Sequence, residues 1–325
     1  MPRKIILDVD TGSDDAVAIM TAILAQDIEL LAVCTVAGNL DIDKTTENTL
    51  RVVEALDPSV PVYRGCAVPL VKNLVPTRIA PSFRVAAVVD GKEVHIHEDE
   101  VPLPKATIKE QRLPAPAYYV ETLREAKEPL TLVAVGPLTN LGAAFAIDPG
   151  IAKNIEEIVV MGGGDRITNA TANAEFNIWA DPEAANWVLK CGAKTTWIPL
   201  DATHAAYLTM DDCASFRALH TLAGNFAADL IEHRIIVHDA AQPLEVKNSA
   251  AVHDALAVCY LIDPKVIINL KEVHLEIGIG DYGEGRTFVD PRYYPDTLNA
   301  RFAFSGDSRR FAGLLTKIFA KGPKA

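Results

Sequence analysis

Short apolar segments alternate along the chain with longer segments whose apolar residues recur at helical spacing. The short segments are apolar at consecutive positions, which predicts strands buried on both faces of a sheet. Strands are predicted at residues 4–7, 30–36, 61–64, 130–135 and 158–161, and helices at residues 14–25, 43–56, 117–126, 138–146 and 308–319. This alternation predicts one α/β domain over residues 1–325, with a mainly parallel central β-sheet flanked by helices.

The stretch from about residue 70 to residue 116 interrupts this alternation. It is rich in proline and charged residues, contains His95 and His97, and has no Gly/Ser-rich hinge on either side. These features predict an insertion or flap within the domain rather than a linker between two domains.

The first predicted strand leads into a turn rich in carboxylates. Asp8, Asp10, Asp14 and Asp15 lie close together, and Gly12 allows a tight turn between them. In a poorly hydrated cleft these carboxylates would repel one another strongly, and a divalent cation would remove the repulsion. Because the nearby donors are all oxygens, a hard ion such as Ca²⁺ or Mg²⁺ is favoured. Capping of the following helix would explain one of the acids but not four.

Two known motifs fit this turn less well. An EF-hand loop counted from Asp8 would place Ser13 and Ile19 where glycine and glutamate are required, so the EF-hand is excluded. The D-x-D-x-[T/V] motif of haloacid-dehalogenase-type phosphatases meets Gly12 at its fifth position and gives the two later acids no role. A phosphatase with Asp8 as its nucleophile remains an alternative.

Polar residues follow other predicted strands at the same edge of the sheet, where open α/β sheets bind their ligands. They are Asn39, the carbonyl of Val135, and, beyond a glycine-rich connection at residues 162–164, Asn169, Glu175 and Asn177. Several side chains that form hydrogen bonds suit a ligand with several hydroxyl groups, so we expect a sugar. A phosphate cradle is disfavoured, because neither G-x-G-x-x-G nor a Walker lysine is present.

His253 and Asp254 precede an apolar helical run near the carboxyl end of the chain. Asp254 is placed to cap that helix and to reach a metal ion. His253 is a candidate acid, because the pKa of an imidazole lies near neutrality. Taken alone, each residue is also explained by an ordinary structural role.

Composition narrows the class of protein further. The net charge is −12 and the basic residues form no cluster, which disfavours nucleic acid as a partner. Apolar runs reach only about ten residues, whereas a membrane-spanning helix needs roughly 18–20, and the amino terminus lacks a signal-peptide pattern. Five scattered cysteines without C-x-x-C predict reduced thiols. A cytoplasmic protein without membrane partners is therefore expected.

Taken together, these segments make the chain resemble the inosine–uridine-preferring nucleoside hydrolase family. The segments that carry the resemblance are ILDVDTGSDDA at 6–16, TVAGN at 35–39, PVYRGCAVP at 61–69, VGPLTN at 135–140, VMGGG at 160–164, AEFNIWADPEAA at 174–185, LDATH at 200–204 and HDALAVCYLIDP at 253–264. The D-x-D-x-G-x-D-D-A pattern is the most specific of them.

The resemblance implies Ca²⁺-dependent hydrolysis of the N-glycosidic bond of a ribonucleoside, which yields the free base and ribose. The calcium ligands implied by motif matching are Asp10, Asp15, Asp254 and the carbonyl of Val135. The implied sugar contacts are Asp14 and Asn39 on the 2′ side, with Asn169, Glu175, Asn177 and Asp254 around the remaining hydroxyls. Asp10 would take the proton of the attacking water, and His253 would be the acid for the leaving base. The family also implies a homodimer or a homotetramer.

The insertion departs from the family pattern. The H-G-x-x-G-x-G flap motif is replaced by residues 95–101, which contain no glycine. Contacts to the base are therefore open among His95, His97, His233 and His238, and the nucleobase preference is open with them. A member of the fold that binds or cleaves a non-standard ribosyl compound is a second alternative.

Overall fold

The main sheet is the centre of the molecule in a computed structural model, which describes residues 2–78, 86–89, 91–290, 292 and 295–324. Its nine strands within these residues are β1 (Arg3–Val9), β2 (Ile28–Thr35), β3 (Val62–Arg64), β6 (Leu130–Ala134), β7 (Ile155–Met161), β8 (Thr195–Ile198), β11 (Leu270–Ile277), β12 (Thr287–Asp290) and β13 (Ala300–Ala303). Two short antiparallel pairs lie outside it, β4 (Ala86–Val89) with β5 (Lys92–His95), and β9 (Leu208–Thr209) with β10 (Ser249–Ala250).

The strands pair in the order β12-β11-β13-β8-β7-β6-β1-β2-β3. The pairs from β3 to β13 are parallel, and β11 and β12 add an antiparallel edge. The predicted mainly parallel sheet is confirmed. Because β1 has β2 and β6 as its neighbours, and β6 in turn pairs with β7, the loops after these four strands open at one edge.

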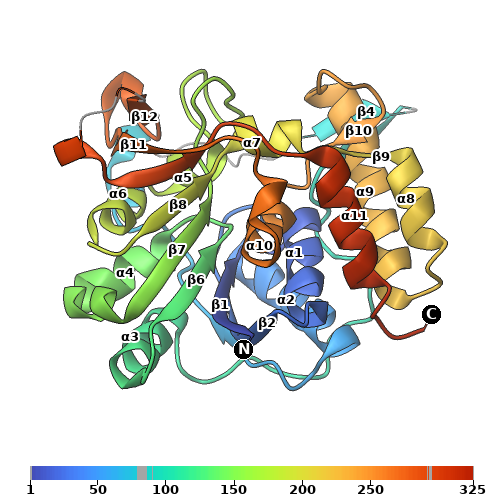
Figure 1. Cartoon of the computed structure of the whole chain (residues 1–325), viewed down its shortest axis with the longest axis horizontal. Coiled ribbons are helices and arrows are strands. Elements are labelled where there is room, and N and C mark those ends of the chain that lie inside the picture. The colour runs from blue at the N-terminus through green and yellow to red at the C-terminus, as the bar shows by residue number, and fades with distance from the viewer. Residues whose placement is uncertain (1, 79–85, 90, 291, 293–294, 325) are drawn as a thin grey trace.

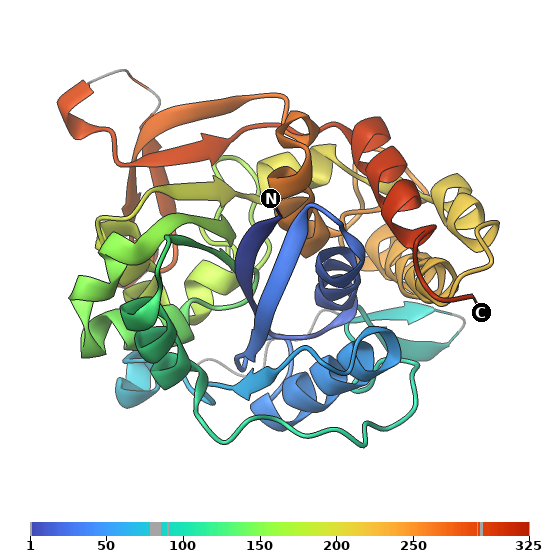
Figure 2. The same cartoon turned by 60° about the horizontal axis from the view of Figure 1, so that its bottom comes forward.

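Helices cover both faces of the sheet (Figures 1 and 2). They are α1 (Ser13–Leu24), α2 (Ile42–Leu56), α3 (Ala115–Glu125), α4 (Thr139–Ile147), α5 (Phe176–Ala180), α6 (Pro182–Lys190), α7 (Leu200–Ala205), α8 (Met210–Arg217), α9 (Leu222–Ala241), α10 (His253–Ile262) and α11 (Ser308–Phe319). One apolar core joins the sheet to α1, α2 and α8–α11, and the other joins it to α3, α4 and α6.

Successive side chains of β1 point to opposite faces of the sheet, so this strand contributes to both apolar cores. Ile5 and Leu7 face the first core and Ile6 faces the second, and all three are fully buried. The strand runs two residues further than predicted, to Val9. Asp8 therefore lies inside the strand, and Asp10 is the first residue beyond it.

The predicted insertion is irregular where it is described. Short 3₁₀ turns at Lys72–Leu74 and Pro76–Arg78 precede the β4–β5 hairpin, and the chain then runs without regular structure to α3. Residues 79–85 and 90 of this predicted segment lie outside the described residues. Lys72 anchors the first turn, because its Nζ donates to the carbonyl of Trp179 at 2.6 Å.

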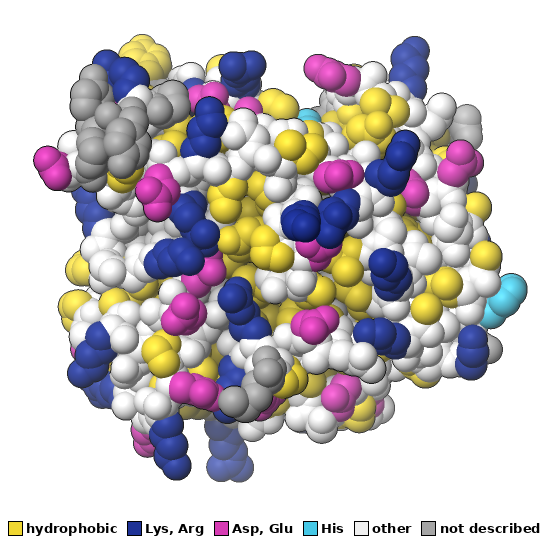
Figure 3. Space-filling model, in the orientation of Figure 1, with side chains coloured by type: hydrophobic (Ala, Val, Ile, Leu, Met, Phe, Trp, Pro, Cys, Tyr) yellow, Lys and Arg dark blue, Asp and Glu magenta, His cyan; other side chains and the backbone are white. Residues whose placement is uncertain are grey.

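Surface and thiol features agree with the composition. On the face shown in Figure 3, acidic and basic side chains are interspersed, and the basic ones form no continuous patch. None of the helices in the described part of the chain combines the length and apolar character needed to span a bilayer. All five cysteines are free thiols.

Two glycines inside helices provide a test of the packing. A Cβ at Gly142 in α4 would lie 2.7 Å from Cβ of Ala184 in α6, whereas a Cβ at Gly313 in α11 would meet open space. We expect Gly142→Ala to lower the free energy of unfolding by about 1–3 kcal/mol, because overpacking outweighs the gain in helix propensity. Gly313→Ala should raise it by about 0.5–1 kcal/mol. Urea unfolding measures both, and stabilisation by both substitutions would contradict the close contact between α4 and α6.

Candidate active site

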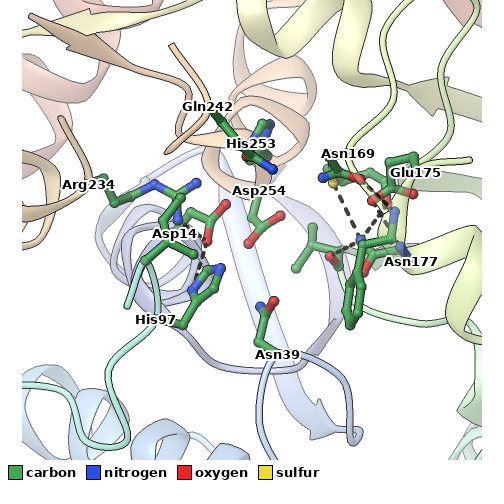
Figure 4. A pocket seen from close by; sticks show the side chains of 14 residues that line it. Asp14, Asn39, His97, Asn169, Glu175, Asn177, Arg234, Gln242, His253 and Asp254 are labelled. Carbon is green, nitrogen blue, oxygen red and sulfur yellow. Dashed lines mark hydrogen bonds and ion pairs between the residues drawn. The ribbon is translucent and has the colours of Figure 1, made fainter. Parts of the chain in front are cut away.

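A pocket open to solvent lies at the carboxyl edge of the sheet (Figure 4). Its lining residues come from the loops after β1, β2, β6 and β7, from α9 and α10, and from the insertion. They are Asp14, Asn39, Ile96, His97, Val135, Met161, Asn169, Glu175, Phe176, Asn177, Arg234, Gln242, His253 and Asp254. The tertiary structure therefore collects almost every predicted site residue in one pocket, and Asp10 and Asp15 lie buried beside it.

The turn after β1 is held by its own carboxylates. The side chain of Asp15 accepts hydrogen bonds from the backbone N–H groups of Asp10 at 3.0 Å and Gly12 at 2.9 Å. Oδ2 of Asp10 accepts from the N–H of Asn39 at 2.6 Å, which ties the β1 turn to the β2 turn. Oδ1 of Asp10 is buried and has no hydrogen-bond partner among the described residues.

Glycines in the neighbouring loops leave space for the Asp10 carboxylate. A Cβ at Gly38 would lie 2.1 Å from its Oδ2, and a Cβ at Gly136 would lie 2.7 Å from its Oδ1. Any side chain at either position would displace the carboxylate. The glycines of the β2 and β6 loops are therefore part of the site, although they contribute no functional group.

Three carboxylates form a candidate metal centre. Asp14, Asp15 and Asp254 each offer a ligand atom, these atoms lie within 4.8 Å of one another, and all three residues are buried. Burial and then the charge of Asp14 raise the pKa of Asp15 to about 6. Burial and the neighbouring carboxylates also raise the pKa of Asp10 and of Asp254 well above the usual range. A bound cation would relieve this repulsion.

A wall of amide and carboxyl groups faces these acids. The carboxylate of Glu175 accepts from the backbone N–H groups of Gly163, Asn177 and Ile178 at 2.9, 2.9 and 3.2 Å, and burial raises its pKa to about 7. Asn177 Nδ2 donates to the carbonyl of Val135 at 2.7 Å. Asn169 Oδ1 accepts from the N–H of Phe176 at 2.9 Å. The backbone therefore holds all three side chains in fixed orientations.

The opposite wall contains a buried ion pair. Arg234 in α9 is 1% exposed, and its Nη1 donates to Oδ1 of Asp14 at 2.9 Å and to Oγ of Ser13 at 2.8 Å. Nδ1 of His97 accepts from the N–H of Ser13 at 3.1 Å and lies 3.8 Å from Oδ1 of Asp14. Asp14 therefore belongs both to the candidate metal centre and to the ion pair with Arg234.

His253 begins α10 and faces the pocket, with its Nδ1 2.7 Å from Oγ1 of Thr203. Burial, and then the positive charge of Arg234, lower the pKa of His253 well below its usual value. The expectation of an imidazole with a pKa near neutrality is therefore wrong. The burial that brings His253 to the pocket also keeps it neutral.

The histidines of the insertion and of α9 differ in whether they reach the pocket. His97 lines the pocket, whereas His95, His233 and His238 are not among its lining residues. The ring of His233 lies 2.7 Å from the carbonyl of His95, so it joins α9 to the insertion. His238 is buried, with Nδ1 3.0 Å from the carbonyl of Gln242.

Asp8 does not contribute to the pocket. Because it lies within β1, its carboxylate points to the other face, where Tyr119 Oη and Asn140 Nδ2 donate to its Oδ2 at 2.9 and 3.0 Å. Burial raises its pKa to about 7. A phosphatase mechanism needs Asp8 as an accessible nucleophile, so that alternative is excluded.

Sequence reasoning did not identify Arg234 and Gln242 as pocket residues. The signal for Arg234 was its position in α9, where it shares a buried face with Leu230, Ile231 and Val237. A charged residue on such a face requires a partner in the interior. Gln242 follows the end of α9 and has no comparable signal.

An acidic pocket lined by oxygen donors at the carboxyl edge of a mainly parallel sheet defines an α/β protein with a candidate metal site. The family model for inosine-uridine preferring nucleoside hydrolases matches residues 5–313. The chain is 36% identical to the pyrimidine-specific ribonucleoside hydrolase RihA of Shewanella woodyi, over 98% of both chains. The chain therefore belongs to the inosine-uridine preferring nucleoside hydrolase family, which confirms the resemblance, and it is an N-glycosyl hydrolase.

Solved structures agree with this assignment. A purine-preferring ribonucleoside hydrolase from Gardnerella vaginalis is similar with a TM-score of 0.84 and 29% identity, over 98% of both chains. The plant nucleoside hydrolase PpNRh1 is similar with a TM-score of 0.85 and 26% identity, over 98% of this chain and 99% of that one. The two similar enzymes match over nearly their whole lengths, so the sheet and both helical layers are common to all three chains.

The raised carboxylate pKa values predict that cation binding is linked to protons. Below about pH 6 a cation must displace the proton of Asp15, so Ca²⁺ affinity should rise with pH between about pH 5 and 7. Calorimetric titration in two buffers of different ionisation enthalpy measures the protons released. Asp15→Asn should weaken binding and reduce the proton release. An affinity independent of pH over this range would contradict the candidate metal centre.

Proposed function

We propose that the protein hydrolyses the N-glycosidic bond of ribonucleosides in a Ca²⁺-dependent reaction and releases free base and ribose. The observation that carries this proposal is the pocket itself. The buried carboxylates of Asp14, Asp15 and Asp254 form its acidic floor, which lies opposite the wall of fixed hydrogen-bonding groups and beside an unpartnered carboxylate oxygen of Asp10. Pyrimidine ribonucleosides are the proposed substrates, because the relative at 36% identity is named as pyrimidine-specific.

Calcium fits the donors that the pocket offers. The proposed ligands are Asp15 and Asp254 of the carboxylate cluster, together with Asp10 and the carbonyl of Val135. Asp14, the third member of that cluster, is paired with Arg234 and is proposed to contact the sugar instead. The proposed ligand atoms are all oxygens, and Oδ1 of Asp10 is available for coordination. Calcium accepts six to eight oxygen ligands in a flexible geometry, as a site that takes a sugar diol and a water together requires. When bound, the ion would make that water easier to deprotonate and would hold the diol.

Asp10 is the proposed base for the attacking water. Its carboxylate lies between the loops after β2 and β6, and burial raises its pKa, which makes it a better proton acceptor than an exposed aspartate. The hydrogen bond from the N–H of Asn39 fixes its orientation. The proton of the water would pass to the Asp10 carboxylate as the bond to the anomeric carbon forms.

The remaining polar residues are proposed to hold the sugar. Asp14 and Asn39 would contact its 2′ side, and Asp254 would lie beneath the diol. Asn169, Glu175 and Asn177 would hold the other hydroxyls, because the backbone already orients all three toward the pocket. An acidic pocket also stabilises the oxocarbenium character that develops as the glycosidic bond breaks.

His253 is proposed to contact the leaving base. Since its Nδ1 is engaged with Thr203, Nε2 is the atom left to face the substrate. In its neutral form the imidazole would donate a hydrogen bond from Nε2 to the base.

The resemblance further supports a cytoplasmic homo-oligomer, a dimer or a tetramer. Sedimentation analysis of the purified protein would test the oligomeric state.

The first experiment is to measure ribose release from a panel of ribonucleosides, with and without prior treatment with EGTA. We expect uridine and cytidine to be cleaved, and we expect stripping of calcium to abolish the activity and added Ca²⁺ to restore it. The panel also ranks the bases and shows whether deoxyribonucleosides are accepted. No release from any nucleoside by calcium-loaded protein would overturn the proposed function.

Substitution of Asp10 tests the proposed base. Asp10→Asn should lower kcat by several orders of magnitude, because it removes a proton acceptor and a ligand charge together. Asp8→Asn is a matched control, because Asp8 is equally buried but lies on the other face of β1. We expect the control to retain most of its activity. Near-normal turnover by Asp10→Asn would exclude Asp10 from the mechanism.

A further inference from the structure

Of the described residues that line the pocket, Arg234 alone carries a permanent positive charge. Two of its three guanidinium nitrogens, Nε and Nη1, form hydrogen bonds within the protein. Nη1 donates to Asp14 and Ser13, and Nε donates to the carbonyl of Ala251 at 3.1 Å. Nη2 makes no hydrogen bond to the described residues, and Figure 4 shows the guanidinium group directed toward the pocket.

This arrangement differs from that of an arginine that only neutralises a carboxylate. A neutralising arginine reaches its best energy by donating two parallel hydrogen bonds to both carboxylate oxygens. Here a single nitrogen contacts a single oxygen of Asp14, and the second nitrogen is left for another acceptor. Nη2 is not a fully buried atom, so a water molecule or a ligand in the pocket can accept its hydrogen bond.

The stereochemistry of ribose determines what lies opposite this donor. In the proposed function the diol faces the acidic floor, and the 2′ hydroxyl lies near Asp14. The base is bonded to C1′, the neighbour of C2′, while the 5′ group lies at the other end of the ring near the wall of Asn169 and Glu175. The base must therefore lie on the same side as Asp14 and its partner Arg234.

We propose that Arg234 stabilises the negative charge that develops on the leaving base, by donating from Nη2 to the acceptor next to the glycosidic nitrogen. In a pyrimidine that acceptor is O2. This inference rests on the proposed function and deepens it, because it assigns the leaving-group side of the pocket to a permanent cation. It makes Arg234 a catalytic residue for bases that leave as anions.

The electrons and protons of this step balance without a further reactant. The C1′–N bond breaks, and its electron pair passes to the base, where it is shared with O2. The water oxygen forms the new bond to C1′, and its proton passes to Asp10. The released base anion takes up a proton from solvent. Arg234 gives up no proton, because its guanidinium remains charged throughout.

The local charges explain why such a group is needed. Asp10, Asp14, Asp15 and Asp254 would carry four negative charges, of which a bound Ca²⁺ offsets two. The remaining negative charge beneath the sugar favours a cationic sugar but repels an anionic base leaving from the same pocket. A permanent cation on the base side reduces this repulsion where the charge appears. Preorganised donors of this kind lower barriers most in water-poor sites.

The test compares leaving groups of different quality in the calcium-loaded enzyme. Uridine needs stabilisation of a poor leaving group, whereas p-nitrophenyl β-ribofuranoside releases a stable phenolate. We expect Arg234→Met to lower kcat for uridine by about 10²-fold, the effect of removing one donor to a developing anion. The loss for the p-nitrophenyl riboside should be smaller than about tenfold, and 5-fluorouridine, whose base is the better anion, should lie between the two.

Two further variants keep the test decisive. Arg234→Lys retains the charge in a side chain of similar length without the planar fork, so it should recover part of the uridine turnover that Arg234→Met loses. Arg51→Met removes another buried arginine, which pairs with Glu47 and Glu100 and does not line the pocket. It should leave the ratio of uridine to p-nitrophenyl riboside turnover unchanged. Calcium titration of each variant confirms that the ion still binds.

Equal losses for both substrates in Arg234→Met or in Arg234→Lys would overturn the inference, because Arg234 would then only position Asp14. If Arg234→Met fails to fold, kcat for uridine and for the p-nitrophenyl riboside is compared between the wild type and Arg234→Lys. A loss confined to uridine then supports the stabilisation of the leaving base by Arg234. Absence of turnover by the wild type with every riboside would overturn the proposed function and this inference together.

Discussion

The burial of several carboxylates in one small volume is the constraint on which the rest of the site depends. Asp10, Asp14, Asp15 and Asp254 are each at most 3% exposed, so water screens little of their mutual repulsion. The fold offsets part of it with backbone N–H groups and with Arg234. Burial, and then the neighbouring carboxylates, still raise the pKa of Asp10, Asp15 and Asp254, so their charged forms remain unfavourable without a cation. A bound cation would stabilise such a site, and its oxygen and N–H groups suit a ligand with several hydroxyl groups.

The sheet topology makes this concentration of charge possible. β1 lies between β2 and β6, so the turns after the three strands meet at one edge, and β7 adds the Glu175 loop beside them. Each turn orients a group of another turn: the N–H of Asn39 holds Asp10, and the side chain of Asn177 holds the carbonyl of Val135. The geometry of the site therefore belongs to the parallel sheet and not to any single loop.

The helical layer over the other side of the pocket has a different role. α9 and α10 supply Arg234, His253 and Asp254, and α9 also contacts the insertion through His233. This layer contains the only permanent cation among the described lining residues, and its charge and burial keep His253 neutral. In the proposed function the two walls have separate roles, with hydrogen bonds for the sugar on one side and positive charge for the base on the other.

The sequence by itself determined the mainly parallel α/β fold, the acidic turn and the polar residues that follow the strands. These features are local: apolar runs, turn residues and their order along the chain report them directly. It did not determine that Asp8 belongs to the opposite core, because the predicted strand ends at Leu7 and leaves Asp8 in the turn, whereas β1 continues to Val9. Nor did it determine the neutral state of His253 or the partnership of Arg234 with Asp14. The first depends on burial and the second on a contact between residues 220 positions apart, and only the packed tertiary structure decides either of them.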